Sequence, residues 1–220
     1  MKAVVIGASG GIGAALAEAL AEEEAEVLRL SRPELDLTDE VTIAAAAAAA
    51  RAGSPELVIV ATGVLHEDGR GPEKAIGELD PAWLARQYAV NAIGPVLVAK
   101  HFLPIMPKRG RSVFAVLSAR VGSISDNRLG GWYGYRASKA ALNQLVRTLA
   151  VEDKRRNDRG IVVALHPGTV ETKLSAPFRQ SGRDLFAPGR AAVQLLDVLD
   201  GLKPQDSGKH FAWDGSEIAP

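Results

Sequence analysis

The sequence has no cysteine among its 220 residues, which excludes disulfides, thiolate nucleophiles and cysteine-based metal sites. Its four histidines are scattered without the spacing of metal ligands, so we expect no metal centre. No apolar run approaches the roughly 18 residues that cross a membrane. The 26 basic residues equal the 26 acidic ones, so net charge gives no reason to expect nucleic acid or an anionic membrane as a partner.

The first residues, Met1 and Lys2, lead directly into a strand-like segment, which leaves no room for a signal peptide. We therefore expect a cytoplasmic protein. A length of 220 residues and a hydrophobic content of 47% fit one globular domain, 1–220, with a substantial core.

Strand-like and helix-like segments alternate along the chain. Apolar runs without polar alternation predict strands that are buried on both faces, as in a parallel sheet. The alanine run at 44–50 predicts a helix, because alanine is the best helix former, and Thr38 is its expected N-cap. The alternation predicts an α/β fold, a doubly wound parallel sheet of about seven strands with helices on both faces. The predicted strands lie at 3–6, 26–30, 56–61, 112–118, 160–166 and 209–213, and the predicted helices at 14–20, 39–52, 80–104, 135–156 and 190–199.

A glycine-dense turn separates the first strand from the first helix in KAVVIGASGGIG, residues 2–13. Its glycines let the backbone pack closely and point several N–H groups in one direction. At a helix N-terminus these donors and the positive end of the helix dipole form an anion site. The pyrophosphate of a dinucleotide suits such a site best. The candidate cofactor-binding residues of the turn are Gly7, Ser9, Gly10, Gly11, Ile12 and Gly13.

The same stretch has two other interpretations. One is a purely structural turn. The other is the G-x-S-x-G nucleophile elbow of α/β hydrolases, which 7–11 also matches, with Ser9 as the nucleophile. That elbow follows a sheet that is already built and needs an oxyanion loop from an earlier strand. Only six residues precede Gly7, so we favour dinucleotide binding.

A second motif, Tyr135-Arg136-Ala137-Ser138-Lys139, places a phenol and an ammonium on one face of a helix, since they are four residues apart. A phenol with a pKa near ~10 is a poor acid–base group at neutral pH unless its anion is stabilised. An ammonium one turn away supplies that stabilisation. An amphipathic helix can also carry this pair with no catalytic role.

Together the motifs resemble those of the short-chain dehydrogenase/reductase family, and the resemblance covers essentially the whole chain. The stretch GGWYGYRASKAALN, at 130–143, and the absence of a separate sugar-binding C-terminal domain resemble the C-factor and sniffer-type carbonyl reductases within it. The resemblance implies a single-domain Rossmann fold and an NAD(P)-dependent oxidoreductase. The motifs, in the family's order, are Gly7-xxx-Gly11-x-Gly13, Asn91 in the long middle helix, Tyr135-xxx-Lys139 and Pro167-Gly168-xxx-Thr172.

The resemblance also implies roles for individual residues. Tyr135 would protonate the carbonyl oxygen as NAD(P)H delivers hydride to the carbon. Lys139 would lower the pKa of Tyr135 and bind the nicotinamide ribose, and Asn91 would hold a water that links Lys139 to solvent. The implied cofactor contacts are Pro167, Gly168 and Val170 along the nicotinamide, Thr172 at the carboxamide or phosphates, and Asp36, with Leu37 beside it, at the adenine amino group.

The end of the second strand bears on the choice of cofactor. Sheets that bind NAD place an acidic residue there for the ribose hydroxyls, whereas sheets that bind NADP place a cation near the 2′-phosphate. This strand ends in Ser31-Arg32, so we favour NADP(H), with NAD(H) as the alternative. Glu34 is close enough to weaken the preference, and Arg32 could also be an ordinary surface charge.

The chain departs from the family's pattern at two places. The usual Asn-Asn-Ala-Gly after the buried strand is here Val60-Ala61-Thr62-Gly63, with Ala61, Thr62 and Gly63 as candidate cofactor contacts. The serine expected to orient the substrate carbonyl, 13 residues before the tyrosine, is Gly122. Ser118, at a rigid strand end, is the first candidate for that role, and Ser123 is the second.

Two further function classes remain open besides a carbonyl reductase or alcohol dehydrogenase. A dinucleotide-binding sensor or interaction protein of the same fold would explain the departures, and the hydrolase would use Ser9. The loops at 66–77 and 173–188 are expected to cover a small carbonyl or alcohol substrate. The resemblance implies a homodimer or homotetramer.

Overall fold

Six parallel strands form one sheet in the computed structural model, which describes residues 1–178 and 185–220. The strand order is β2-β1-β3-β4-β5-β6, and every neighbouring pair is parallel. The predicted α/β class and the parallel sheet are therefore confirmed. The strands are β1 (Lys2–Ile6), β2 (Glu26–Leu30), β3 (Leu57–Val60), β4 (Ser112–Leu117), β5 (Gly160–His166) and β6 (His210–Ala212).

The sheet has one strand fewer than the expected seven. After β2 the chain turns directly into a helix, and the next strand, β3, pairs with the opposite side of β1, so no further strand extends the sheet beyond β2. The strand order reverses between β1 and β3. In open sheets of this kind, ligands bind outside the carboxyl ends of the strands at such a reversal.

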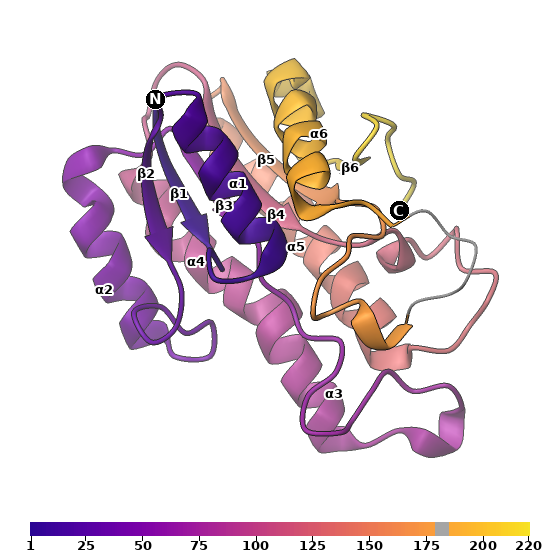
Figure 1. The fold of residues 1–220 in the computed structure, drawn as a ribbon. Helices are drawn as coiled ribbons and strands as arrows, with labels where there is room; N and C mark the ends of the chain where they lie inside the picture. The colour runs from indigo at the N-terminus through magenta and orange to yellow at the C-terminus, as the bar shows by residue number, and fades with distance from the viewer. Residues whose placement is uncertain (179–184) are drawn as a thin grey trace.

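Helices cover both faces of the sheet (Figure 1). α1 and α6 pack together on one face, towards the viewer of Figure 1, and α2, α4 and α5 lie on the other. The loops that follow the strands gather at the lower end of the view, below the arrowheads. The helices are α1 (Gly11–Glu22), α2 (Glu40–Ala50), α3 (Pro81–Tyr88), α4 (Gly94–Phe102), α5 (Tyr133–Arg156) and α6 (Pro188–Gly201).

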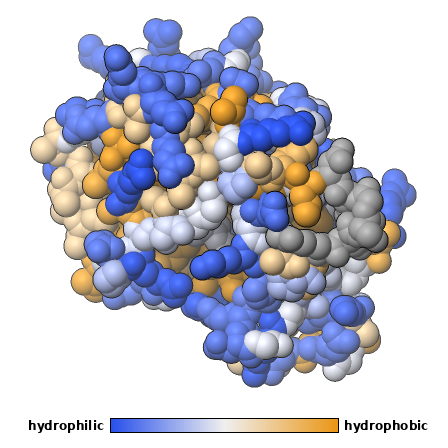
Figure 2. Space-filling model, viewed as in Figure 1, coloured by the Kyte–Doolittle hydropathy of each residue, from blue (hydrophilic) through white to orange (hydrophobic). Residues whose placement is uncertain are grey.

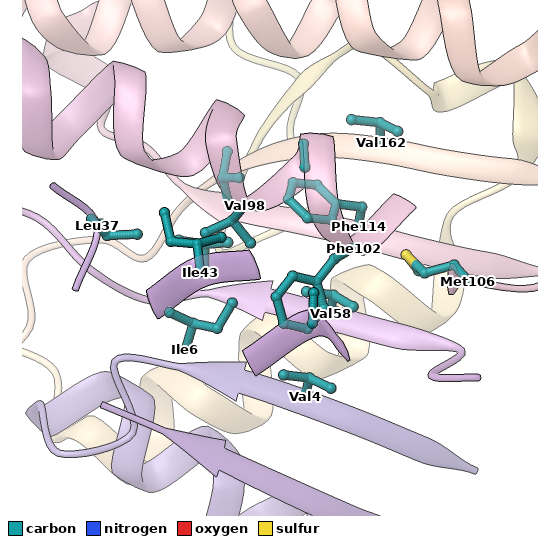
Figure 3. Packing of buried hydrophobic residues seen from close by; sticks show 14 of the residues in the cluster. Val4, Ile6, Leu37, Ile43, Val58, Val98, Phe102, Met106, Phe114 and Val162 are labelled. Atoms are coloured by element: carbon teal, nitrogen blue, oxygen red, sulfur yellow. The ribbon is translucent and has the colours of Figure 1, made fainter. Parts of the chain in front are cut away.

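Each face of the sheet has its own hydrophobic layer, because successive side chains of a strand point to opposite faces. Val4 and Ile6 of β1 contribute to the layer beneath α2 and α4, whereas Ala3 and Val5 contribute to the layer beneath α1 and α6. Phe102 and Phe114 fill the middle of the first layer (Figure 3). With both faces covered, β3 and β4 are completely buried, as the uninterrupted apolar runs predict.

The alanine run forms α2, as predicted, and its exposed alanines colour the surface at the left of Figure 2 as weakly apolar. The prediction that Thr38 caps this helix is wrong. Asp39 is the N-cap, and its side chain accepts a hydrogen bond from the Val41 N–H at 3.0 Å. The Thr38 hydroxyl is not free to cap, since it donates to Asp36 Oδ1 at 2.7 Å.

The long middle helix is not a uniform α-helix. A π-helical turn (Ala89–Ile93) joins α3 to α4, and Asn91 lies in it. Within the described residues, the stretch Pro81–Ile105 is the one helical stretch long and apolar enough to cross a membrane by length and composition alone, and half of its most apolar window is buried inside the protein. Val98 and Phe102 of this stretch are fully buried in the core beside the sheet, which is the packing of a core helix.

Candidate active site

The glycine turn joins β1 to α1 at the point where the strand order reverses. Gly7 has a φ of +87°, and a Cβ there would lie 2.7 Å from Thr62 Cγ2 and 2.8 Å from the Ala61 carbonyl oxygen. A Cβ on Gly13 would overlap the carbonyl group of Gly7. Side chains at these two positions would therefore push the turn away from β3 and the helix away from the turn.

The first turn of α1 leaves backbone donors unpaired. Its N-cap is Gly10, which has no side chain to accept from them. Among the residues that the structure describes, none accepts a hydrogen bond from the N–H groups of Gly11, Ile12 or Gly13. Ser9 N donates to Ser31 Oγ at 2.9 Å, which ties the turn to the end of β2. The turn thus presents three amides that have no acceptor among the described residues.

The residues after β2 divide between surface and core. Arg32 is exposed, and no ion pair with Glu34 forms. The Asp36 carboxylate accepts hydrogen bonds from Thr38 N and Thr38 Oγ1, which hold the pKa of Asp36 below its usual value. Leu37 is buried in the core, where its Cβ would lie 2.6 Å from a Cβ added to Gly94. Arg32 is therefore an exposed cation at this edge, and it forms no ion pair with a described residue.

The end of β3 lies against both the glycine turn and the candidate catalytic residues. Ala61 N donates to the Ile6 carbonyl oxygen of β1 at 2.8 Å. The Thr62 hydroxyl is buried without a hydrogen-bond partner in the part of the chain that the structure describes. A Cβ on Gly63 would lie 3.4 Å from Asn91 Oδ1 and 3.7 Å from Lys139 Nζ. Gly63 thus lies where three segments meet: the end of β3, the π-helical turn with Asn91, and α5 with Lys139.

Asn91 is fully buried, and its amide links three segments. Oδ1 accepts from Val64 N at 2.8 Å, while Nδ2 donates to the Val64 carbonyl oxygen at 2.9 Å and to Ser138 Oγ at 3.1 Å. The π-helical turn lets this side chain reach both the loop after β3 and α5. Since Ser138 directly precedes Lys139, Asn91 fixes the face of α5 that carries the candidate pair.

Tyr135 and Lys139 lie one turn apart on α5, and they are 7% and 2% exposed. Lys139 Nζ lies 5.8 Å from the centre of the Tyr135 ring and donates to the Leu117 carbonyl oxygen at 2.8 Å. Burial raises the pKa of Tyr135 to about 12 and lowers the pKa of Lys139 to about 8. The chain alone therefore keeps the phenol protonated at neutral pH, and the lowering of the Tyr135 pKa that the resemblance implies is not present in it.

Neither candidate serine forms a hydrogen bond with Tyr135. The Ser118 hydroxyl donates to Asn143 Oδ1 at 2.7 Å, on the α5 side of the sheet. Ser123 Oγ lies 3.4 Å from both Ser125 Oγ and the carbonyl oxygen of Pro220. No residue in the described ranges forms a hydrogen bond with the Tyr135 hydroxyl, so this group is left available to a substrate oxygen.

The segment after β5 returns to the glycine turn. A Cβ on Gly11 would lie 3.0 Å from Thr172 Cγ2, so Thr172 closes over the start of α1. Gly168 has a φ of +78° and no space for a Cβ between Phe186 and Trp213. Val170 is buried and forms a parallel β-bridge with Phe186. The residues from Pro167 to Thr172 are therefore brought beside the turn, as the motif order predicts.

A series of aromatic rings extends from Tyr135. The Trp132 ring lies 6.1 Å from the Tyr135 ring and 5.3 Å from the Phe178 ring, and the His66 ring lies 5.8 Å from the Phe178 ring. His66 and Phe178 come from the two loops that were expected to cover the substrate, at 66–77 and 173–188. Of the second loop, residues 179–184 lie outside the described residues.

Glu73 is a residue of this region that no sequence motif predicts. It is only 2% exposed and accepts a hydrogen bond from Gly134 N at the start of α5. Its surroundings in the sequence, GRGPEKAIGE at 69–78, look like an ordinary polar loop. No local pattern separates Glu73 from the exposed Glu78 five residues later.

The hydrolase alternative gains no support from the geometry. No histidine of the described chain forms a hydrogen bond with Ser9. His66 bonds with the Lys173 carbonyl oxygen, His101 with Glu40 and His210 with Asn143, while Nδ1 of His166 is buried without a partner in the described chain. Ser9 thus lacks the base that a serine nucleophile requires.

A family model described as "Enoyl-(Acyl carrier protein) reductase" matches residues 31–195. The chain is 37% identical over 145 residues to the protein named C-signal of Myxococcus xanthus, and the match covers 66% of this chain and 82% of that protein. These matches confirm the resemblance that the motifs predict.

The solved structures that are similar over 100% of the chain include two carbonyl reductases. The carbonyl reductase Sniffer of D. melanogaster has a TM-score of 0.83 at 21% identity, with 99% of that chain covered. The NADPH-bound carbonyl reductase from chicken fatty liver also has a TM-score of 0.83, at 25% identity and with 94% of that chain covered. The fold is therefore that of these reductases.

Proposed function

Because the chain belongs to the short-chain dehydrogenase/reductase family of NAD(P)-dependent oxidoreductases, we propose that it transfers hydride between NADP(H) and a small carbonyl or alcohol compound. Tyr135 is the acid–base group in this proposal. The observation that carries it is the buried pair Tyr135 and Lys139, which lies across Gly63 from the glycine turn.

The residues at the sheet's carboxyl edge fit a dinucleotide. The free amides of Gly11, Ile12 and Gly13 suit a pyrophosphate, and the buried Thr62 hydroxyl lacks a partner that a ligand would supply. Arg32 would pair with a 2′-phosphate, which favours NADP(H) over NAD(H). Bound NADPH would supply the hydride that the substrate carbon receives. The remaining proposed contacts are Gly7, Ser9, Gly10, Ser31, Asp36, Leu37, Ala61, Gly63, Asn91, Pro167, Gly168, Val170 and Thr172.

The protein's own part in the reduction is to place and protonate the substrate oxygen. With a pKa of about 12, Tyr135 holds its proton at neutral pH and can donate it to the oxygen as negative charge develops there. Lys139, charged below its pKa of about 8, would then stabilise the tyrosinate. Asn91 holds the face of α5 in place and would position the water that returns a proton to Lys139.

One of two serines would supply the second donor to the substrate oxygen. Ser118 and Ser123 remain the candidates, and each hydroxyl has a protein partner. Ser118 would serve only if its hydroxyl turned away from Asn143.

We also propose that residues 1–220 act as one domain in a cytoplasmic homodimer or homotetramer. Exposed apolar side chains on the helices of one sheet face support an interface, among them Ile93 and Val151, which are 49% and 51% exposed. The family resemblance is the basis for the oligomeric assignment.

Titration with NADPH and, separately, NADH tests the cofactor half of the proposal, with nicotinamide fluorescence as the signal. We expect tighter binding of NADPH and loss of this preference in Arg32→Ala, while Arg128→Ala, an exposed arginine in the loop before α5, keeps it. Failure to bind either cofactor would overturn the proposal. Preference for NADH would retain the fold and refute the role of Arg32.

A Tyr135→Phe variant tests the catalytic half on a panel of aldehydes and ketones. We expect the rate of NADPH oxidation to fall by about 10²–10⁴-fold, the usual contribution of a positioned acid, with unchanged cofactor binding.

The second candidate function is a dinucleotide-binding sensor without turnover. It is favoured by the lack of a hydrogen-bond partner for Tyr135 among the serines. A wild-type protein that binds NADPH but reduces no carbonyl on the panel would support the sensor.

A further inference from the structure

Glu73 is a buried acidic side chain that belongs to none of the motifs. It lies in the loop between β3 and α3. Its Oε2 accepts from Gly134 N at 3.0 Å, and its Oε1 accepts from Gln87 Nε2 at 2.9 Å. Across the described ranges no cation pairs with it, whereas Asp153, the other buried acid, pairs with Arg156. Burying a carboxylate is costly unless hydrogen bonds satisfy it, so the two donors to Glu73 are needed to keep it buried.

The start of α5 lacks a cap of its own. The N-cap residue is Trp132, whose indole has no acceptor, and its backbone is in the left-handed region at φ 52° and ψ 43°. A helix N-terminus without a side-chain acceptor leaves its first N–H groups unpaired. Glu73 supplies two acceptors from 60 residues away in the sequence: its carboxylate binds Gly134 N, and its own carbonyl oxygen accepts from Trp132 N.

The contact is closely packed on the α3 side. A Cβ on Gly134 would lie 2.8 Å from Leu84 Cδ2 and would overlap the amide of Gln87. Gln87 is fully buried, and its Oε1 has no hydrogen-bond partner in the described chain. Because Gly134 has no side chain, the loop and α3 can pack directly against the first turn of α5. Tyr135 is the next residue along α5.

We propose that Glu73 is a positioning residue for the active site. It replaces the missing cap of α5, holds Trp132 in the left-handed conformation, and so sets the Trp132 ring against Tyr135 and Phe178. The loop that covers the substrate is thereby fastened to the helix that carries the acid. This inference rests on the proposed function for its kinetic consequence, but not for its structural one.

The kinetic test compares Glu73→Ala and Glu73→Gln with Glu78→Ala. Glu78 is the matched control, because it is in the same loop and accepts a backbone N–H, from Lys74, but is exposed. We expect Glu73→Ala to lower kcat for carbonyl reduction by about 10- to 100-fold, the cost of a small displacement of a catalytic group, with NADPH affinity unchanged.

Glu73→Gln should restore most of kcat. Its amide oxygen can accept from Gly134 N, and its amide nitrogen can donate to the unpartnered Gln87 Oε1 once the Gln87 amide rotates. A general loss of folding would instead lower NADPH binding together with kcat. Such a parallel loss, an unchanged kcat in Glu73→Ala, or no rescue by Glu73→Gln would overturn the inference.

A second measurement works even for a protein without turnover. The chain has three tryptophans, so 5-fluorotryptophan labelling gives three ¹⁹F resonances, and Trp132→Phe identifies the one from Trp132. We expect this resonance to shift or broaden in Glu73→Ala, to return in Glu73→Gln and to stay in Glu78→Ala, with Trp213 constant throughout. An unmoved Trp132 resonance would refute the positioning role. If wild-type protein reduces no carbonyl, the proposed function fails while this spectrum still decides the inference.

Discussion

α1 and α5 both begin at the carboxyl edge of the sheet, and neither is capped by the side chain of its own N-cap residue. At α1 the N-cap is Gly10, and the next three amides have no acceptor in the described protein. At α5 the N-cap is Trp132, and Glu73 binds the amide of Gly134. A negative group is stabilising at either end, since both carry the positive end of a helix dipole. The first is open to an anion from outside, and the second is closed by the protein's own carboxylate.

The starts of α1 and α5 therefore suit different roles. An open end can exchange its ligand, so α1 suits a cofactor that must bind and leave. A closed end cannot exchange, so α5 can hold Tyr135 and Lys139 in a fixed geometry, as a preorganised site requires.

The largest effect is expected at the fixed end, from Lys139→Met. Turnover should fall by about 10²–10⁴-fold, because the ammonium that assists Tyr135 is removed. The free energy of unfolding should rise at pH 7 by about 1–2 kcal/mol, since the charged form of this buried lysine is disfavoured, as its lowered pKa of about 8 indicates, and only one hydrogen bond, to Leu117, is lost. Urea unfolding measures the gain. A destabilised Lys139→Met would mean that the charge supports the fold.

A carboxylate at the open end, Gly10→Asp, should remove the distinction between the two helices. An Asp at the N-cap is expected to stabilise α1 by only a few tenths of a kcal/mol relative to Gly, while it repels the pyrophosphate and weakens NADPH binding about 10-fold or more. Gly10→Ala is the control, because any Cβ at this position lies 3.3 Å from the Gly7 carbonyl oxygen. Equal losses of NADPH affinity in both variants would show that space, and not charge, governs the site.

A pH profile of kcat/KM tests the charge of Lys139 on α5 separately from the amides at the start of α1. Near neutral pH this is the smallest of the expected effects. The pKa of Lys139 is lowered to about 8 by burial, so its charge is present below that pH and is lost above it. The kcat/KM for NADPH, which reports the free enzyme, should be level near pH 7 and fall about tenfold per unit above pH 8. Gly10→Asp should leave this alkaline limb in place. A level profile up to pH 10 would indicate that the charge of Lys139 is not required.

The parts of the molecule that follow from local pattern could be predicted from the sequence. Each of the six strand-like runs forms a strand, because an apolar run between turns leaves few other ways to bury it. The geometry of the glycine turn also follows locally: Gly7 needs a positive φ and Gly13 needs close contact with it. The strand count was overestimated, since no run in the sequence corresponds to a seventh strand.

The parts that depend on distant residues could not be predicted. Glu73 acquires its role from Gly134 and Gln87, which are remote in the sequence. The cap of α2 was misplaced by one residue because the Thr38 hydroxyl is bonded to Asp36, a competition that spacing alone does not reveal. The roles of the serines depend on side-chain direction, and Ser118 directs its hydroxyl to Asn143.

The π-helical turn at Ala89–Ile93 sets a limit on how this chain can be shortened or redesigned. Such a turn contains one residue more than an α-turn. Deleting a residue from it would give a regular and more easily formed helix, but would rotate Asn91 relative to α4 by about 100°. Asn91 would lose Val64 and Ser138 while Phe102 kept its place in the core. Sequence alignments and designs that treat 81–102 as one ideal helix would therefore assign Asn91 to the wrong face.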